Sequence, residues 1–141
     1  MADTYIPVAV QRLVLAESKG FCEYCWLPPN FSSNSFQFDH IVPTSKGGLS
    51  VFGNIARSCA GCNGYKQDKT HHFDPLTHQI CRLYNPREDK WLDHFQWIED
   101  DLMIDGKTAI GRTTVQLLQL NRDGVVNLRQ LLKMVGLHPP F

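Results

Sequence analysis

Two short segments, CEYC at residues 22–25 and CAGCNGYK at residues 59–66, decide the fold that this sequence can adopt. Each begins with two cysteines separated by two residues, a spacing that lets both sulfurs of one tight turn reach the same ion. Together the pairs offer four thiolates, which would complete a closed tetrahedral shell for a structural zinc ion. The four candidate zinc ligands are Cys22, Cys25, Cys59 and Cys62. The open alternatives are two unrelated cysteine pairs or a redox-active pair.

The segment between the two cysteine pairs holds a candidate catalytic group. The separation from Cys25 to Cys59 exceeds the roughly 15–20 residues common between zinc-binding pairs, so a module of strands and loops must lie between them. That module contains FDHIVPTSKGG at residues 38–48. Histidine has an unperturbed pKa of about 6.5, which suits a base that removes a proton from water near neutral pH. We therefore interpret His40 as a candidate general base for phosphodiester hydrolysis.

Three further polar residues complete this candidate site. Asp39 offers a carboxylate and Asn63 an amide oxygen, and Mg²⁺ or Mn²⁺ accepts both kinds of ligand. A divalent ion there would stabilise the charge on the phosphate and on the leaving oxygen. Asn54 could hold one nitrogen of His40 and so select its tautomer. Because neighbouring residues of a flat strand point to opposite faces, Asp39 and His40 can serve one site only if the strand twists or one side chain reaches it obliquely.

Over about residues 8–73, the sequence resembles the zinc-containing HNH endonucleases. The resemblance is carried by CEYC, FDHIVPTSKGG, Asn54 and CAGCNGYK. The resemblance implies a small ββα-metal core with a four-cysteine zinc site and an activity on nucleic acid, with double-stranded DNA as the expected partner. It also implies that His40 is the general base and that Asn54 positions the histidine and its loop. Asn63 would take the third motif place, where histidine often stands, which makes an HNN-type variant. Asp39 and Asn63 would then bind the catalytic Mg²⁺ or Mn²⁺.

Hydrophobic patterning predicts an α+β fold with an N-terminal helix and a C-terminal extension. The expected elements are a helix over about 5–20, strand pieces around 36–42, a helix or helical turn over 52–66, a hairpin over 95–104, and helices over 113–120 and 123–135. In the last helix, one apolar face is expected at Leu128, Leu131, Leu132 and Val135. We expect residues 1–73 to form the nuclease core, and residues 74–141 to form an extension of a β-hairpin and two helices packed on it. The extension is similar to that of a bacterial subset of HNH proteins.

Composition limits the setting in which the protein works. The formal net charge is zero, and the first seventy residues hold six Lys or Arg against five acids, so a site for a polyanion must be local. No segment approaches the roughly 18–20 apolar residues of a transmembrane helix, and no signal peptide is visible. Five cysteines suit metal binding in a reducing compartment, so we expect an intracellular protein. The resemblance of the extension to a bacterial subset then implies the bacterial cytoplasm. Cys81 is left over as an inert thiol.

Four cations near the motifs are candidates for contacts with phosphates, and solvated surface charge is the alternative for each. They are Lys46, Arg57, Lys66 and Lys69. Lys66 is favoured because it follows Asn63 by one helical turn. Three functions remain open: a metal-dependent nuclease, a zinc-containing nucleic-acid-binding module without catalysis, and a subunit of a larger nuclease or defence system. The combination of Asp39, His40, Asn54 and Asn63 favours the nuclease, because binding alone needs no such set.

Overall fold

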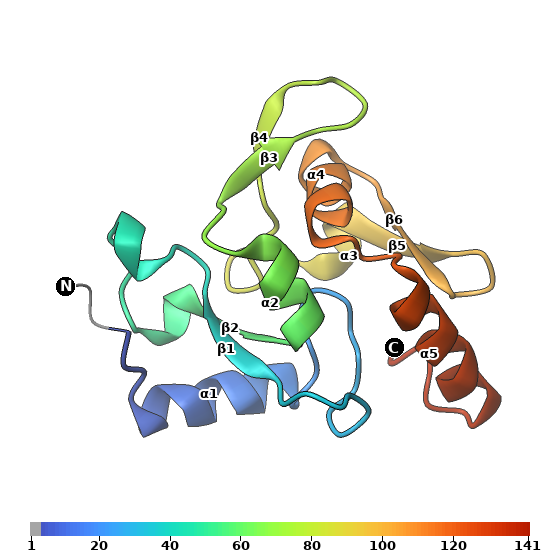
Figure 1. Cartoon of the computed structure of the whole chain (residues 1–141), viewed down its shortest axis with the longest axis horizontal. Coiled ribbons are helices and arrows are strands. Elements are labelled where there is room, and N and C mark those ends of the chain that lie inside the picture. Colours follow the sequence, from blue (N-terminus) through green and yellow to red (C-terminus); the bar gives the residue numbers. More distant parts are fainter. Residues whose placement is uncertain (1–3) are drawn as a thin grey trace. The chain divides into compact units, whose positions relative to one another are not determined.

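The computed structural model describes residues 4–141, which form two compact units (Figure 1). The first unit runs to Thr70 and also includes Asn85–Asp89, a later segment of the chain. The second unit comprises His71–Tyr84 and Lys90–Phe141. Within the described residues, no helix is long and apolar enough to cross a membrane.

The first unit contains one long helix, a two-stranded sheet and a short second helix. Its elements are α1 (Val8–Ser18), β1 (Gln37–His40), the 3₁₀ turns η1 (Thr44–Lys46) and η2 (Phe52–Asn54), β2 (Ile55–Ser58) and α2 (Ala60–Lys66). The strands are antiparallel, with Phe38 opposite Arg57 and His40 opposite Ile55. Helix α1 packs on β2 and α2 packs on β1, so the order β1, β2, α2 makes a ββα arrangement (Figure 1).

The ends of α1 follow from local backbone chemistry. The helix begins directly after Pro7, whose fixed φ suits the first turn of a helix. It ends at Lys19, which has a φ of 54°, and Gly20, which has a φ of 82°. This left-handed pair is a common way to stop a helix, because the glycine adopts positive φ without steric cost. The helix contributes Val14, which is fully buried, to the core of this unit.

The second unit is built from two hairpins and three helices. Its elements are β3 (His71–Phe73), β4 (Ile80–Arg82), α3 (Trp91–His94), β5 (Phe95–Ile98), β6 (Met103–Gly106), α4 (Ala109–Leu118) and α5 (Asp123–Met134). Trp91 and Phe95 stack in its core, with ring centroids 5.0 Å apart. The buried Asp74 accepts two hydrogen bonds from Arg112 of α4, at 3.0 and 2.9 Å, and this pairing lowers the pKa of the Asp74 carboxyl.

The structure changes several of the expected elements. Residues 55–58, expected to be helical, form β2, because their backbone pairs with β1. Helix α4 begins at Ala109, earlier than expected, since the Thr108 hydroxyl accepts a hydrogen bond from the backbone N–H of Gly111 and caps it. The hairpin expected over 95–104 is present as β5 and β6. The hairpin of β3 with β4 and the short helix α3 were not predicted.

The expected apolar face of the last helix is wrong in part. Leu132 is buried, but Leu131 and Val135 are 61% and 68% exposed. Arg129 is buried in their place and donates hydrogen bonds to the carbonyl oxygens of Leu102 and Leu120. A charged residue that satisfies backbone carbonyls is invisible to a search for apolar periodicity.

Candidate metal centre and active site

The four predicted zinc ligands form one buried cluster. The sulfur atoms of Cys22, Cys25, Cys59 and Cys62 all lie within 4.8 Å of one another. The Sγ atoms of Cys25 and Cys59 are 3.7 Å apart. Zinc–sulfur bonds of about 2.3 Å in a tetrahedron place the sulfurs about 3.8 Å apart, so the observed spacing fits zinc. This cluster could therefore hold a metal ion, and its all-sulfur composition favours zinc over Mg²⁺ or Ca²⁺.

Burial makes a metal ion the natural partner for these thiols. Cys22 and Cys62 are fully buried, and burial raises the pKa of the Cys22 thiol well above its ordinary value. A zinc ion would displace the thiol protons and compensate the charge of the thiolates, which is why such sites couple metal binding to folding. Cys59 also caps α2, because its sulfur accepts a hydrogen bond from the backbone N–H of Cys62 at 3.4 Å.

The first cysteine turn is attached to β2 through Glu23. The backbone N–H of Glu23 donates to the carbonyl oxygen of Arg57, and the Glu23 carboxylate accepts from the backbone N–H of Arg57, both at 2.9 Å. The same carboxylate forms an ion pair with Arg87, whose guanidinium lies 5.0 Å from the ring centroid of Phe52 in η2. Arg87 thus links the cysteine turn to the loop that precedes β2.

His40 lies at the end of β1 and is half-buried. Its Nε2 lies 2.9 Å from the hydroxyl oxygen of Ser50, a hydrogen-bonding distance, and Ser50 belongs to the loop between the strands. The Ser50 hydroxyl can donate or accept, so it can orient either tautomer of the imidazole. Asp39, the preceding residue, is 5% exposed and lies on the buried side of the strand.

Asn54 holds the loop between β1 and β2 in place. Its amide oxygen accepts from the backbone N–H of Val42, and its amide nitrogen donates to the carbonyl oxygens of Val42 and Leu49, all at 2.9 Å. The loop passes so close that a Cβ on Gly48 would lie 1.7 Å from the Val42 oxygen, so only glycine fits there. Asn54 therefore fixes the loop that carries Ser50.

The Asp39 carboxylate is surrounded by donors. It accepts a hydrogen bond from the Tyr24 hydroxyl at 2.9 Å, and the Lys66 ammonium lies 3.2 Å from one of its oxygens. The same ammonium donates to the carbonyl oxygen of Ile41 at 3.2 Å. Burial raises the pKa of the Asp39 carboxyl above its ordinary value, although Lys66 and Tyr24 act in the opposite direction.

A surface recess of about 260 Å³ brings together the candidate residues Asp39, His40 and Asn63, whereas Asn54 is not among its lining residues. It is lined by Phe38, Asp39, His40, Pro43, Thr44, Asn63, Gln67 and Asp68. Asn63 donates a hydrogen bond from its amide nitrogen to Gln37, which leaves its amide oxygen as the remaining ligand group. The recess thus joins an imidazole, two carboxylates and two amides, a set that can accept a proton and bind a hard cation.

The family comparison agrees with this arrangement. Residues 22–69 match the family model of HNH endonucleases, and the match spans both cysteine pairs, the ββα elements and the recess. The chain contains an HNH endonuclease domain. No curated protein matches the sequence. The α+β class and the ββα arrangement with a four-cysteine cluster, both expected from the sequence, are confirmed for this HNH domain.

The structure corrects two details of the expected site in the HNH domain. Asn54 contacts the backbone of the loop, and the Ser50 hydroxyl is what contacts His40 Nε2, so Asn54 does not select the histidine tautomer directly. Lys66 is 1% exposed and pairs with Asp39, so it is not a surface contact for phosphate. Its position four residues after Cys62 puts it on the buried face of α2.

The other candidate cations of the HNH domain take different positions. Lys46 is exposed and donates to the carbonyl oxygen of Asp68, and Lys69 forms an exposed ion pair with the Asp68 carboxylate, so both lie beside the recess. Arg57 is half-buried and stacks on Phe38, with its guanidinium carbon 4.4 Å from the ring centroid.

Sequence reasoning missed the residues that support the HNH site. These are Ser50 beside His40, Tyr24 beside Asp39, Gln37 beside Asn63, and the Glu23–Arg87 pair. Glu23 and Tyr24 had a signal, because both lie inside the CEYC turn and must pack near the metal cluster. The other partners are far apart in the sequence and depend on the tertiary fold.

Replacing Lys66 with methionine should destabilise the HNH domain by about 3–5 kcal/mol, the range found when a buried ion pair loses one partner. Methionine keeps most of the apolar stem but leaves the Asp39 carboxylate buried without its cation. Chemical denaturation measures the loss, and Lys69→Met is the matched control because the Lys69–Asp68 pair is exposed. The Lys66→Met, Asp39→Asn double variant should recover part of the loss. Equal stabilities of Lys66→Met and wild type would contradict the assigned pairing.

Proposed function

We propose that this chain is a metal-dependent endonuclease that hydrolyses phosphodiester bonds of double-stranded DNA, with His40 as the general base. The observation that carries the proposal is the recess in which the His40 imidazole, oriented by Ser50, lies with Asp39 and Asn63 beside the cysteine cluster. Asn63 directly follows Cys62, so a zinc ion would hold the amide in register with the imidazole. The HNH match supports an activity on nucleic acid.

Each residue has a distinct part in the proposed reaction. The His40 imidazole accepts a proton from the attacking water, and the Ser50 hydroxyl orients the ring through its Nε2. Asn54 holds the loop that carries Ser50. The four-cysteine site, which has no open position, keeps the scaffold of the recess rigid and takes no part in the chemistry.

The recess suits Mg²⁺ or Mn²⁺ as the catalytic ion. Asp39 and the Asn63 amide oxygen would hold it, and one carboxylate with an amide leaves most positions to water and phosphate, as Mg²⁺ prefers. When bound, the ion would neutralise charge on the phosphate and stabilise the leaving oxygen. The Lys66 ammonium pairs with the Asp39 carboxylate, so with an ion bound Asp39 would interact with both the ammonium and the ion.

The pairing of Asp39 with Lys66 also favours a second candidate function. A carboxylate that is already neutralised by a buried ammonium could serve folding alone, in which case the domain would bind nucleic acid without cutting it. Such a module could act within a larger nuclease system. The two candidates differ in whether added Mg²⁺ produces cleavage.

Brief EDTA treatment should stop cleavage without unfolding the protein, because the proposed oxygen site is open to solvent and the four-cysteine site is closed. Mg²⁺ or Mn²⁺ should restore activity, and excess Zn²⁺ should not. Asp39→Asn should lower cleavage by about 100-fold or more, since several kcal/mol of charge stabilisation are lost. Asp68→Asn is the matched control, because Asp68 lines the same recess but is not a proposed ligand. Full activity in EDTA with zinc still bound would contradict the proposal.

A further inference from the structure

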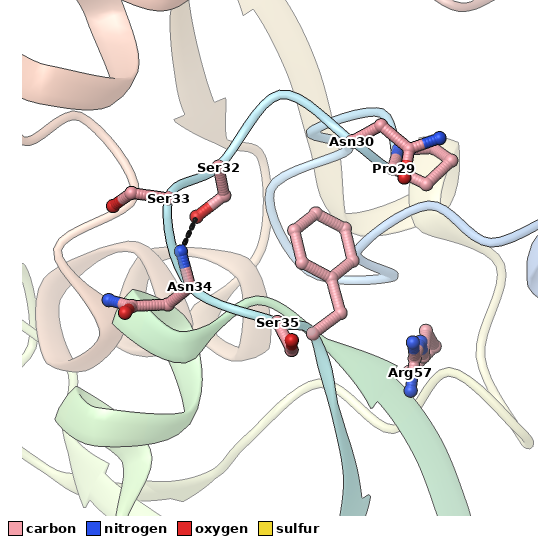
Figure 2. Close-up of a pocket in the computed structure, with 8 residues that line it drawn as sticks. Pro29, Asn30, Ser32, Ser33, Asn34, Ser35 and Arg57 are labelled. Carbon is pink, nitrogen blue, oxygen red and sulfur yellow. Dashed lines mark hydrogen bonds between the residues drawn. The ribbon is translucent and has the colours of Figure 1, made fainter.

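A second recess in the HNH domain, of about 240 Å³, has no role in the proposed reaction. It is lined by Pro29, Asn30, Ser32, Ser33, Asn34, Ser35, Phe36 and Arg57, and we call it the Arg57 recess. Figure 2 shows Ser32, Ser33 and Asn34 on the loop that leads into β1, and Arg57 on the side of β2. Its lining thus combines neutral hydroxyl and amide groups with a single cation.

The Arg57 guanidinium has no hydrogen-bond acceptor among residues 4–141. Among the described residues, no acceptor forms a hydrogen bond or ion pair with it, and its buried Nε is unsatisfied. The nearby Glu23 carboxylate is committed to Arg87 and to the backbone N–H of Arg57. No residue lining the recess, within the part of the chain that the structure describes, is acidic. The charge of the Cys22 thiolate favours the guanidinium and acts against the effect of burial, but Cys22 accepts no hydrogen bond from it. A half-buried guanidinium whose N–H groups have no acceptor is costly unless a ligand supplies one.

The guanidinium is also held in a defined orientation. It stacks on Phe38 with its central carbon 4.4 Å from the ring centroid, and it lies 6.0 Å from the centroid of Phe36. Such stacking leaves the N–H groups at the edge of the plane free to form two parallel hydrogen bonds with a phosphate. Burial lowers the pKa of Arg57, but an arginine stays charged at neutral pH.

The position of the Arg57 recess relates it to the catalytic one. Phe38 lines the catalytic recess and also stacks on Arg57. Phe36 directly precedes β1 and His40 ends it, a step of four residues or about 13 Å at the usual rise of a strand. At the roughly 3.4 Å rise per base of one DNA strand, this spans about four nucleotides.

We propose that the Arg57 recess binds a non-scissile phosphate of the nucleic-acid backbone and so anchors the strand a few nucleotides from the bond that is cut. The inference rests on the proposed function, because it assumes nucleic acid as the substrate. The hydroxyls of Ser33 and Ser35 and the amide of Asn34 can donate further hydrogen bonds to the phosphate oxygens. A protein whose formal net charge is zero would gain from such a local anchor, because its overall charge does not attract a polyanion.

Binding measured without cleavage tests this proposal. In the 141-residue chain carrying His40→Ala, fluorescence anisotropy with a labelled DNA duplex gives the dissociation constant over a range of salt concentrations. Arg57→Gln should weaken binding by about tenfold or more and lower the slope of log K against log salt by about 1. Arg12→Gln, which makes the same charge change on exposed α1, should alter affinity by less than about twofold. Ser33→Glu should reproduce the Arg57→Gln loss, and Ser33→Ala should not.

The remaining outcomes are equally decisive. Equal losses of DNA affinity in Arg57→Gln and Arg12→Gln would overturn the proposal. It would also be overturned if the Arg57→Gln variant lost affinity only because it had lost its zinc. If the Ser33→Glu variant binds DNA with wild-type affinity, no phosphate enters the recess and the proposal is wrong. Inorganic phosphate tests whether the recess is a site for a free anion. The proposal would also be overturned if phosphate raised the melting temperature of the protein only when Arg57 is present, while Arg57→Gln left DNA binding unchanged. Arg57-dependent binding without metal-dependent cleavage would contradict the nuclease proposal and leave this one standing.

Discussion

Cys59→Ser should unfold the HNH domain and abolish its zinc binding. Cys59 supplies one of the four clustered sulfurs and also caps α2, so its loss affects both the metal and the helix that carries Asn63. Zinc binding contributes about 10–16 kcal/mol in small zinc domains, whereas a domain is stable by only about 5–15 kcal/mol. Elemental analysis should find one zinc per chain in the wild type and much less in the variant, and circular dichroism should show lost structure.

Cys81→Ser is the matched control for this prediction. Cys81 lies in β4 of the second unit, outside the sulfur cluster, so the variant should keep its zinc and its melting temperature. Both variants replace a cysteine sulfur with oxygen, but only Cys59→Ser removes a zinc ligand. The comparison therefore separates the effect of losing a ligand from the effect of losing a thiol. A Cys59→Ser protein with a full zinc content and the wild-type melting temperature would show that the cluster is not the basis of the fold.

His40→Ala should lower cleavage by about 10²–10⁴-fold, the usual contribution of a positioned general base. The zinc content and the melting temperature should not change, because His40 is half-exposed and its hydrogen bond goes to a loop hydroxyl. Initial rates under saturating Mg²⁺ measure the effect. Ser50→Ala should give a smaller loss, since it removes only the orienting hydrogen bond.

His71→Ala controls for the loss of any imidazole. His71 is exposed on β3 in the second unit, so its removal should leave the rate unchanged. Wild-type rates for His40→Ala would end the assignment of the base, whatever the zinc content. Equal losses in the two histidine variants would point instead to a general effect on the protein.

The sequence predicts the cysteine cluster well because its geometry is local. Each CxxC turn fixes two sulfurs, and four soft ligands with this spacing have few other uses. The same holds for the hairpin of β5 and β6, where alternating residues flank a turn. These features need no knowledge of which segments meet in the fold.

The surroundings of the candidate site depend on tertiary contacts. Sequence alternation along four residues of β1 could not decide whether Asp39 or His40 faces the interior. Lys66 was expected to contact phosphate because it follows Asn63 by one helical turn, yet its ammonium is buried and pairs with the carboxylate of Asp39. The four-residue spacing from Cys62 is the local signal that could have placed Lys66 on the buried face of α2.

Strand β2 shows why the expected helix over 52–66 is wrong at its start. Ile55–Ser58 is too short to display a period, and its extended form comes from pairing with β1 and from the hydrogen bonds that Glu23 makes to Arg57. Tertiary pairing therefore overrides local preference in this segment. Helix α2 begins only after Cys59, where the sulfur cap is available.

The most direct test of the central claim is the fate of covalently closed circular DNA, which has no ends and is opened only by an endonuclease. Wild-type protein and His40→Ala, each with a measured zinc content, are incubated with the circle in Mg²⁺ and in EDTA. We predict nicked or linear DNA from the wild type in Mg²⁺ alone, and intact circles in the other three reactions. Intact circles with wild-type protein in both Mg²⁺ and Mn²⁺, or equal cleavage by His40→Ala, would contradict the account.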